Sequence, residues 1–280
     1  SNNPSGLPSA VIDTTNTYTT SSALADGIWY LHIRTADNAG NWADTEYSVG
    51  PFKIDTTDPS NPSSFSSNPT YNIWSNDNTI FVEWSGATDG AGSGVVGFGL
   101  FWSTNPIGIP SQVIDTIDPN TTSSVLVDGD SWYLHIITVD GAGNWNTTVF
   151  HIGPFKIDTV LPTWDQTPTD QTVPGGGSFS YDLNASDLLS GISNWAINDT
   201  TNFSISNQGV ITSIGTLVAG TYGLEVTVTD AAGNSLTASF DVVQEPQPIP
   251  GFPLAAIVFG LMSALGIGVL ARRQNTRRKH

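Results

Sequence analysis

The protein has 280 residues, of which 25 are acidic and 8 are basic, and it contains no cysteine and four histidines. The lack of cysteine excludes a disulfide framework, a zinc-thiolate site, an iron-sulfur cluster and a cysteine nucleophile, and four histidines leave little for metal or acid-base chemistry. A formal charge of -17 argues against a nucleic-acid partner, because such proteins need a basic face to neutralise phosphates.

The first part of the chain recurs about one hundred residues later, which predicts tandem copies of one domain. Val11-Ile12-Asp13-Thr14 returns as Val113-Ile114-Asp115-Thr116, and Gly50 to Thr56 returns as Gly153 to Thr159. Residues 60–102, which precede the repeated part in the second copy, have no counterpart at the start of the chain. We therefore expect residues 1–58 to be the C-terminal part of a truncated domain, residues 59–160 to be a complete domain, and the natural protein to continue upstream.

Strands are predicted on both sides of a D-x-A-G-N sequence, which begins at Asp37, Asp140 and Asp230. Glycine and asparagine tolerate the left-handed backbone of a tight hairpin, and aspartate can accept hydrogen bonds from the backbone that follows it. This sequence is typical of a hairpin turn, and a calcium-binding turn is the alternative.

The strand before the second of these turns alternates between two sets of side chains. Since successive side chains of a strand point to opposite faces, the set containing Leu134 and Ile136 is predicted to line the core. The alternate set, which contains His135, is predicted to face solvent or a neighbour. Glu225 stands in the third copy where His32 and His135 stand in the first two, so we expect no function for these histidines.

Short strands with frequent turn signals predict an all-β fold of tandem antiparallel β-sandwiches. Residues 60–158, with Val82-Glu83-Trp84-Ser85 and the strand from Trp132 to the second turn, resemble immunoglobulin-like and fibronectin type III-like modules of prokaryotic surface proteins. Residues 161–243 resemble a cadherin-like variant through Phe179 to Leu183 and Gly220-Thr221-Tyr222. The resemblance implies that Tyr222 is the tyrosine-corner residue of its sandwich.

Calcium is the one cofactor that these resemblances imply, because cadherin modules bind it between domains through acidic loops. Aspartates near the predicted domain ends are Asp55, Asp58, Asp158, Asp187 and Asp230. The D-x-N-D-N signature of the family is missing, and the loop from Asp89 to Ser93 contains a single carboxylate. We expect no cofactor and no metal ligands, with bound calcium as the alternative to solvated turn aspartates.

The C-terminus is predicted to anchor the chain in a membrane. Residues 244–253 form a Pro-rich linker, residues 254–271 are uncharged and long enough for a transmembrane helix, and residues 272–280 form a basic tail. Basic residues beside a span stay in the cytoplasm, so the sandwiches are predicted to lie outside. Pro250-Gly251-Phe252, the apolar run and Arg272-Arg273 resemble the sorting signal of archaeal surface proteins, which implies an archaeosortase as a partner.

Five N-x-S/T sequences provide candidate glycosylation sites, at Asn120, Asn146, Asn184, Asn198 and Asn202. The chain contains no G-x-S-x-G, H-E-x-x-H or phosphate-loop sequence, so we expect no catalytic residue in it. We expect a non-catalytic, membrane-anchored cell-surface protein that serves as a stalk, adhesion or envelope component and offers its modules to a surface protein or glycan. The alternative is the stalk of a surface enzyme, such as a protease, whose catalytic domain lies upstream of residue 1.

Overall fold

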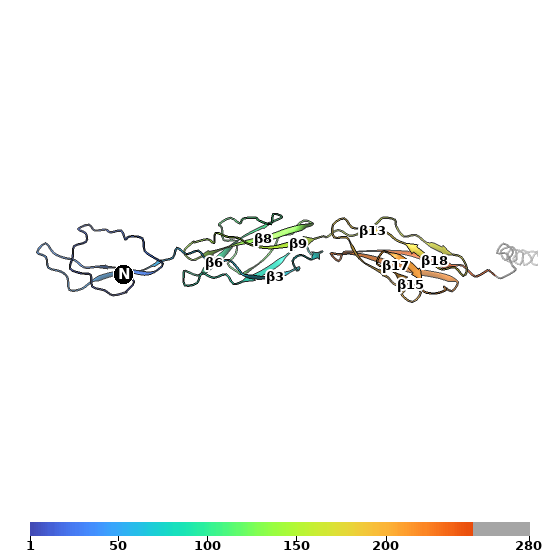
Figure 1. The fold of residues 1–280 in the computed structure, drawn as a ribbon, viewed down its shortest axis with the longest axis horizontal. Coiled ribbons are helices and arrows are strands. Elements are labelled where there is room, and N and C mark those ends of the chain that lie inside the picture. Colours follow the sequence, from blue (N-terminus) through green and yellow to red (C-terminus); the bar gives the residue numbers. More distant parts are fainter. Residues whose placement is uncertain (249–280) are drawn as a thin grey trace, which may run out of the picture. The chain divides into compact units, whose positions relative to one another are not determined.

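A computed structural model of the chain describes residues 1–248, which form eighteen β-strands and no helix. These residues divide into two units, residues 1–159 and the residues from Val160 onward (Figure 1). Within residues 1–248 no segment has the length and apolarity of a membrane-crossing helix. The predicted sorting motif, transmembrane helix and basic tail lie outside the described residues.

The first unit contains two copies of one module. Residues 1–58 are the first copy, or first module, and residues 59–159 are the second copy, or second module, which forms two sheets. The smaller sheet has the antiparallel order β3 (Ser64–Asn68), β5 (Phe81–Ser85), β7 (Asn120–Thr122). The larger sheet has the order β4 (Trp74–Ser75), β9 (Phe150–Ile157), β8 (Gly129–Asp140), β6 (Val95–Ser103), in which only β4 and β9 are parallel. The prediction of antiparallel sheets is confirmed for this module.

The core of this module is formed by the alternate side chains that the sequence pattern selects. On β5, Val82 and Trp84 are buried while Phe81 and Glu83 are exposed. On β8, Leu134 and Ile136 are completely buried, and the Trp84 ring meets Phe98 of β6 edge to face. Burial of each such side chain contributes about 1.5–3 kcal/mol to folding, so this cluster is the main source of the module's stability.

The alternate face of β8 is more covered than its pattern suggests, since His135, Ile137 and Val139 are also buried. The cause lies on β6, where Gly97 and Gly99 have no side chains. A Cβ at Gly97 would press on Ile114, and one at Gly99 would press on the carbonyl oxygens of Ser111 and Val113. The segment that follows β6 therefore packs against this face, and the neighbour is a piece of the same chain.

The first copy of the module contains one sheet of two antiparallel strands, β1 (Gly27–Ile33) and β2 (Tyr47–Ile54). Side chains that are buried in the second copy are partly exposed to solvent in the first copy. Leu31 is 37% exposed where Leu134 is 0% exposed, and Phe52 is 46% exposed where Phe155 is 0% exposed. Within residues 1–248, no second sheet packs against the apolar face of the β1–β2 sheet.

The second unit contains a larger and a smaller sheet around its own core. The larger has the order β11 (Gln171–Val173), β18 (Ser235–Gln244), β17 (Gly220–Asp230), β14 (Ile192–Ile197). The smaller has the order β12 (Ser180–Asp182), β16 (Val210–Ser213), β15 (Phe203–Ile205), and β10 (Thr163–Trp164) pairs with β13 (Ala185–Ser186). Phe203, Ile211 and Val226 are completely buried between the sheets.

Tyr222 makes the contact expected of a tyrosine corner. Its hydroxyl donates to the carbonyl of Val218 at 2.9 Å and accepts from the N–H of the same residue at 3.1 Å. The ring packs edge to face on Phe203 in the core. The residue therefore fixes the loop that leads into β17, as its position near the start of that strand predicts.

Candidate functional site

The three D-x-A-G-N turns are built alike around the aspartate carboxylate. In the second turn, Asp140 Oδ1 accepts from the N–H groups of Ala142 and Asn144 at 2.9 and 2.8 Å, and Oδ2 accepts from the Asn144 side chain at 2.8 Å. Gly143 of this second turn has a φ of 94°, a left-handed conformation that favours glycine. The hairpin interpretation of this sequence is correct.

Asp140 is 1% exposed, so its charge depends on these partners. Burial raises the pKa of the carboxyl, but hydrogen bonds from the side chain and the N–H of Asn144 outweigh burial and hold the pKa below its usual value. The group is therefore ionised at neutral pH inside the module. Asp37 of the first turn makes the same bonds to Asn41 while remaining exposed.

Asp140 belongs to a cluster of three carboxylates within the first unit. One oxygen each of Asp55, Asp89 and Asp140 lies within 4.8 Å of the other two. Asp55 directly follows β2, Asp89 lies in the loop between β5 and β6, and Asp140 ends β8. We call this set the acidic cluster. The Asp55 Oδ2 atom accepts from the Ser93 N–H at 2.6 Å, and Asp89 Oδ2 accepts from the Gly94 N–H at 2.7 Å.

One oxygen of the acidic cluster has no donor. Asp89 Oδ1 is buried and forms no hydrogen bond within the described residues. A buried carboxylate oxygen without a partner is costly, and a bound cation would satisfy it. Gly92 approaches both Asp55 and Asp89 so closely that a Cβ at this position would collide with their Oδ2 atoms. Three carboxylates from separate loops are hard oxygen ligands of the kind that Ca²⁺ requires, so the cluster fits this ion.

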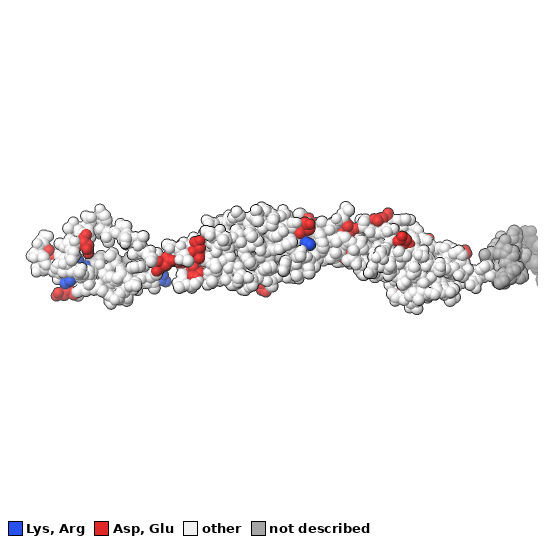
Figure 2. Space-filling view, in the orientation of Figure 1, with Lys and Arg blue, Asp and Glu red and all other residues white. Residues whose placement is uncertain are grey.

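The acidic cluster borders a hollow of about 940 Å³ in the first unit. Asp26, Asp55, Asp58 and Asp89 line it, and Lys53 is the one basic residue of that lining. On the face drawn in Figure 2, acidic side chains far outnumber basic ones. The surroundings of the cluster therefore favour a cation over an anion.

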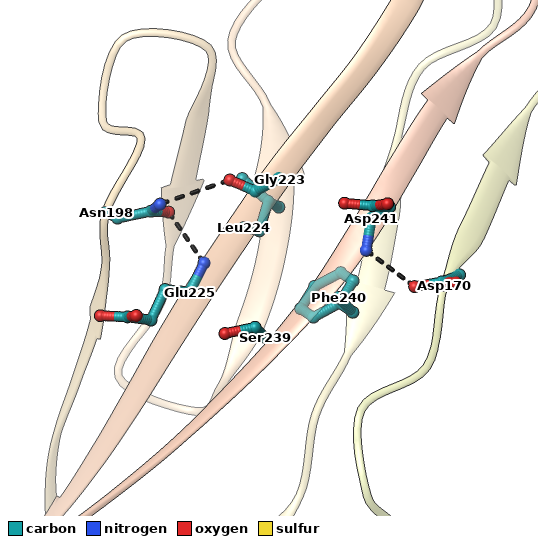
Figure 3. Close-up of a pocket in the computed structure, with 8 residues that line it drawn as sticks. All are labelled: Asp170, Asn198, Gly223, Leu224, Glu225, Ser239, Phe240 and Asp241. Atoms are coloured by element: carbon teal, nitrogen blue, oxygen red, sulfur yellow. Dashed lines mark hydrogen bonds between the residues drawn. The ribbon is translucent and has the colours of Figure 1, made fainter.

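A second hollow, of about 420 Å³, lies on the second unit beside β17 and β18 (Figure 3). Its polar groups mainly hold the strands together. Asn198 accepts from the Glu225 N–H at 3.0 Å and donates to the Gly223 carbonyl at 3.3 Å. The Asp241 N–H donates to Asp170 at 2.8 Å. We interpret this hollow as a structural feature of the sheet surface.

The candidate glycosylation sites differ in how their side-chain amides are used. Asn146 donates to the Pro59 carbonyl at 2.6 Å, Asn198 to Gly223, and Asn202 to Asp199 at 2.8 Å. Asn120 and Asn184 are exposed, and no such bond of their side chains occurs within residues 1–248. These two amides are the most open to modification.

The aspartates that the sequence places near domain ends have different environments. Asp55 joins the acidic cluster, whereas Asp58 is exposed beside it. Asp187 accepts from the N–H groups of Leu189, Ser190 and Gly191, and Asp230 closes the third turn. Asp158 is fully buried at the end of β9. The sequence presents the Asp89 loop and the Asp140 turn separately and does not predict that they join Asp55, because each loop contributes a single carboxylate.

Models of protein families give no match for this chain, and neither do the curated proteins. Solved structures do match. The N-terminal eight immunoglobulin domains of Down syndrome cell adhesion molecule are similar over 67% of this chain at 12% identity, with a TM-score of 0.41. The chain covers 25% of that fragment, so it spans about a quarter of its length.

Two further matches come from other module types. Fibronectin(III)-like modules of CbhA from Clostridium thermocellum match over 68% of this chain and 98% of theirs, with 14% identity and a TM-score of 0.35. A protocadherin gammaB7 structure, the EC3-6 cis-dimer, matches over 78% of this chain and 58% of its own, with 16% identity and a TM-score of 0.33. The chain is thus similar to immunoglobulin, fibronectin III-like and cadherin domains.

Proposed function

We propose that this chain is a non-catalytic, membrane-anchored cell-surface protein whose sandwich modules act as a stalk, adhesion or envelope component. The observation that carries the proposal is the repetition of one module type, in which the same aspartate-capped hairpin recurs three times along the chain. Modules with their own cores suit a spacer that holds binding surfaces away from a membrane. Their surfaces would be offered to another surface protein or to a glycan.

The uncharged run at residues 254–271 supports the membrane part of the proposal, since it is long enough to cross a bilayer and five basic residues follow it. The Pro250-Gly251-Phe252 motif before this run supports processing by an archaeosortase. The direct test is cell fractionation of the whole chain beside a version that ends at Gln244. Release of the shortened version from the membrane fraction is expected.

We further propose that Ca²⁺ binds the acidic cluster and stiffens the first unit. An ion held by Asp55, Asp89 and Asp140 would tie the residue after β2 to two loops of the second module. The unpartnered Asp89 Oδ1 atom supports this role, because the ion would supply the missing interaction. The ion would also offset the repulsion between three carboxylates that lie within 4.8 Å of one another.

Calorimetry of the full-length chain, with Ca²⁺ or with a chelator, tests the calcium proposal. We expect Ca²⁺ to raise the unfolding midpoint of the first unit by about 5 °C, since a ligand that binds only the folded state stabilises it. Asp89→Asn should remove most of this rise. Asp37→Asn is the control, because Asp37 caps the turn equivalent to that of Asp140 and belongs to no carboxylate cluster within residues 1–248. Equal unfolding midpoints with and without Ca²⁺ in the wild-type chain would mean that the folded first unit does not bind the ion.

A further inference from the structure

Two histidines face each other across β8 and β9 of the second module. His135 of β8 is the direct partner of His151 of β9 in the strand register. Their Nδ1 atoms are 2.7 Å apart, and the two rings meet edge to face at 4.9 Å. His135 is 0% exposed, whereas His151 is exposed. The Nδ1–Nδ1 contact therefore connects a buried imidazole to a solvent-exposed one.

The hydrogen bonds around His135 favour one of its two neutral tautomers. Ser103 Oγ lies 3.2 Å from the Asn105 carbonyl, to which it can donate its single hydrogen, and 2.9 Å from His135 Nε2, from which it can then accept. In this tautomer Nε2 is protonated, and Nδ1 of the neutral ring has a bare lone pair. The His151 Nδ1 atom lies 2.7 Å from this lone pair and is its donor when His151 carries its hydrogen on Nδ1.

The His135 ring is held firmly in this orientation. Gly108 lies so close to it that a Cβ there would collide with the ring at Nε2 and Cδ2. The centroid of the His135 ring lies 5.9 Å from that of Phe101 and 6.2 Å from that of Tyr133. Burial, and then the nearby His151, lower the pKa of His135 to about 4, so the ring stays neutral at neutral pH. A neutral imidazole whose single N–H is held by a hydrogen bond, with its other nitrogen free to bind the ion, is the arrangement found in metal-ligating histidines.

We propose that His135 and His151 form a binding site for a divalent transition-metal ion of the Zn²⁺, Ni²⁺ or Cu²⁺ type, bound between the two Nδ1 atoms. Imidazole nitrogens suit these ions, and an ion with bonds of about 2.1 Å to both needs the nitrogens about 3.0–3.4 Å apart, with both lone pairs turned toward it. The His151 ring, which is exposed, must therefore swing away from its hydrogen bond to His135 when the ion binds. Its hydrogen moves from Nδ1 to Nε2 through solvent, so both rings remain neutral, and water completes the coordination.

The first module provides a natural comparison at the same position. His32 lies opposite Ser48 in the strand register, and the His32 Nδ1 atom is 2.8 Å from the Ser48 hydroxyl. The first copy thus has one imidazole where the second copy has two. A serine at position 151 is therefore a side chain that the repeat itself uses on this strand, which makes His151→Ser a mild substitution.

The test is a titration of the full-length chain with Ni²⁺, with excess Ca²⁺ present to occupy carboxylate sites. The imidazole NMR signals report each histidine separately, and bound Ni²⁺ broadens the signals of its ligands. We expect His135 and His151 to broaden together, at Ni²⁺ concentrations that leave His32 and His280 sharp. His151→Ser should weaken nickel binding at His135 by about tenfold or more, and His32→Ser should leave it unchanged.

Two results would overturn the proposal. One is unchanged nickel affinity at His135 in the His151→Ser protein, with circular dichroism showing that the variant is folded. The other is broadening of His32 at the same nickel concentration as His135, which would mean that one imidazole without a second histidine accounts for binding.

Discussion

His135 links the stability of the second module to pH, because this ring is neutral in the folded protein. Its folded-state pKa is about 4, whereas an exposed histidine titrates near pH 6.5. Between these values the unfolded chain binds the extra proton. Stability is therefore complete above about pH 6.5 and is lost as the pH falls toward about 4, by at most about 3 kcal/mol.

Urea unfolding of the whole chain with a metal chelator present, at neutral pH and at about pH 5, measures this loss. His135→Asn should remove most of the pH dependence in this range. His32→Asn, at the equivalent position of the first copy, should retain it. A wild-type protein whose unfolding free energy is constant over this range would contradict the assignment of a buried neutral ring.

The glycosylation sites give a second prediction at the level of single side chains. Transfer of a glycan to a folded module needs a free side-chain amide, so Asn120 and Asn184 are expected to carry glycans more often than Asn146, whose amide binds the Pro59 carbonyl. Mass spectrometry of peptides from the protein made in its native host measures occupancy at each position. Higher occupancy at Asn146 than at Asn120 would count against the structural argument.

Among the strands, β8 shows what alternation predicts and what it misses. The core face containing Leu134 and Ile136 follows from the two-residue period of a strand. The burial of His135 on the opposite face does not, because it depends on a later segment packing over Gly97 and Gly99. A pattern within one strand carries no information about which distant segment covers it.

The equivalent leucines of β1 and β8 allow the sheet environments to be compared directly. Leu134→Ala should lower the local unfolding free energy of β8 by about 2–5 kcal/mol, because it leaves a cavity in a closed core. Leu31→Ala should cost about 1 kcal/mol or less in β1, since Leu31 is already 37% exposed. Hydrogen exchange of the β8 and β1 amides gives the two values separately. Equal losses would mean that the sheet of the first copy is covered in solution.

At the level of the whole molecule, the sequence predicts the all-β class, the antiparallel sheets and the aspartate turns, because each follows from local spacing. The acidic cluster could not be predicted in this way. Its members come from residues 55, 89 and 140, and each loop contributes one carboxylate. Only the folded chain brings them together, so counting acidic residues within one loop underestimates the site.

We propose that the sandwich modules lie outside the cell and are held there by the C-terminal run. The decisive experiment is protease treatment of intact cells that produce the whole chain, beside cells that produce the version ending at Gln244. We predict that the external protease digests the modules of the whole chain, which stays with the membrane, while the shortened chain is found in the medium. Modules that resist the protease until the cells are lysed would mean that they lie inside the cell, and a shortened chain that remains equally bound to the membrane would mean that the C-terminal run is not the anchor.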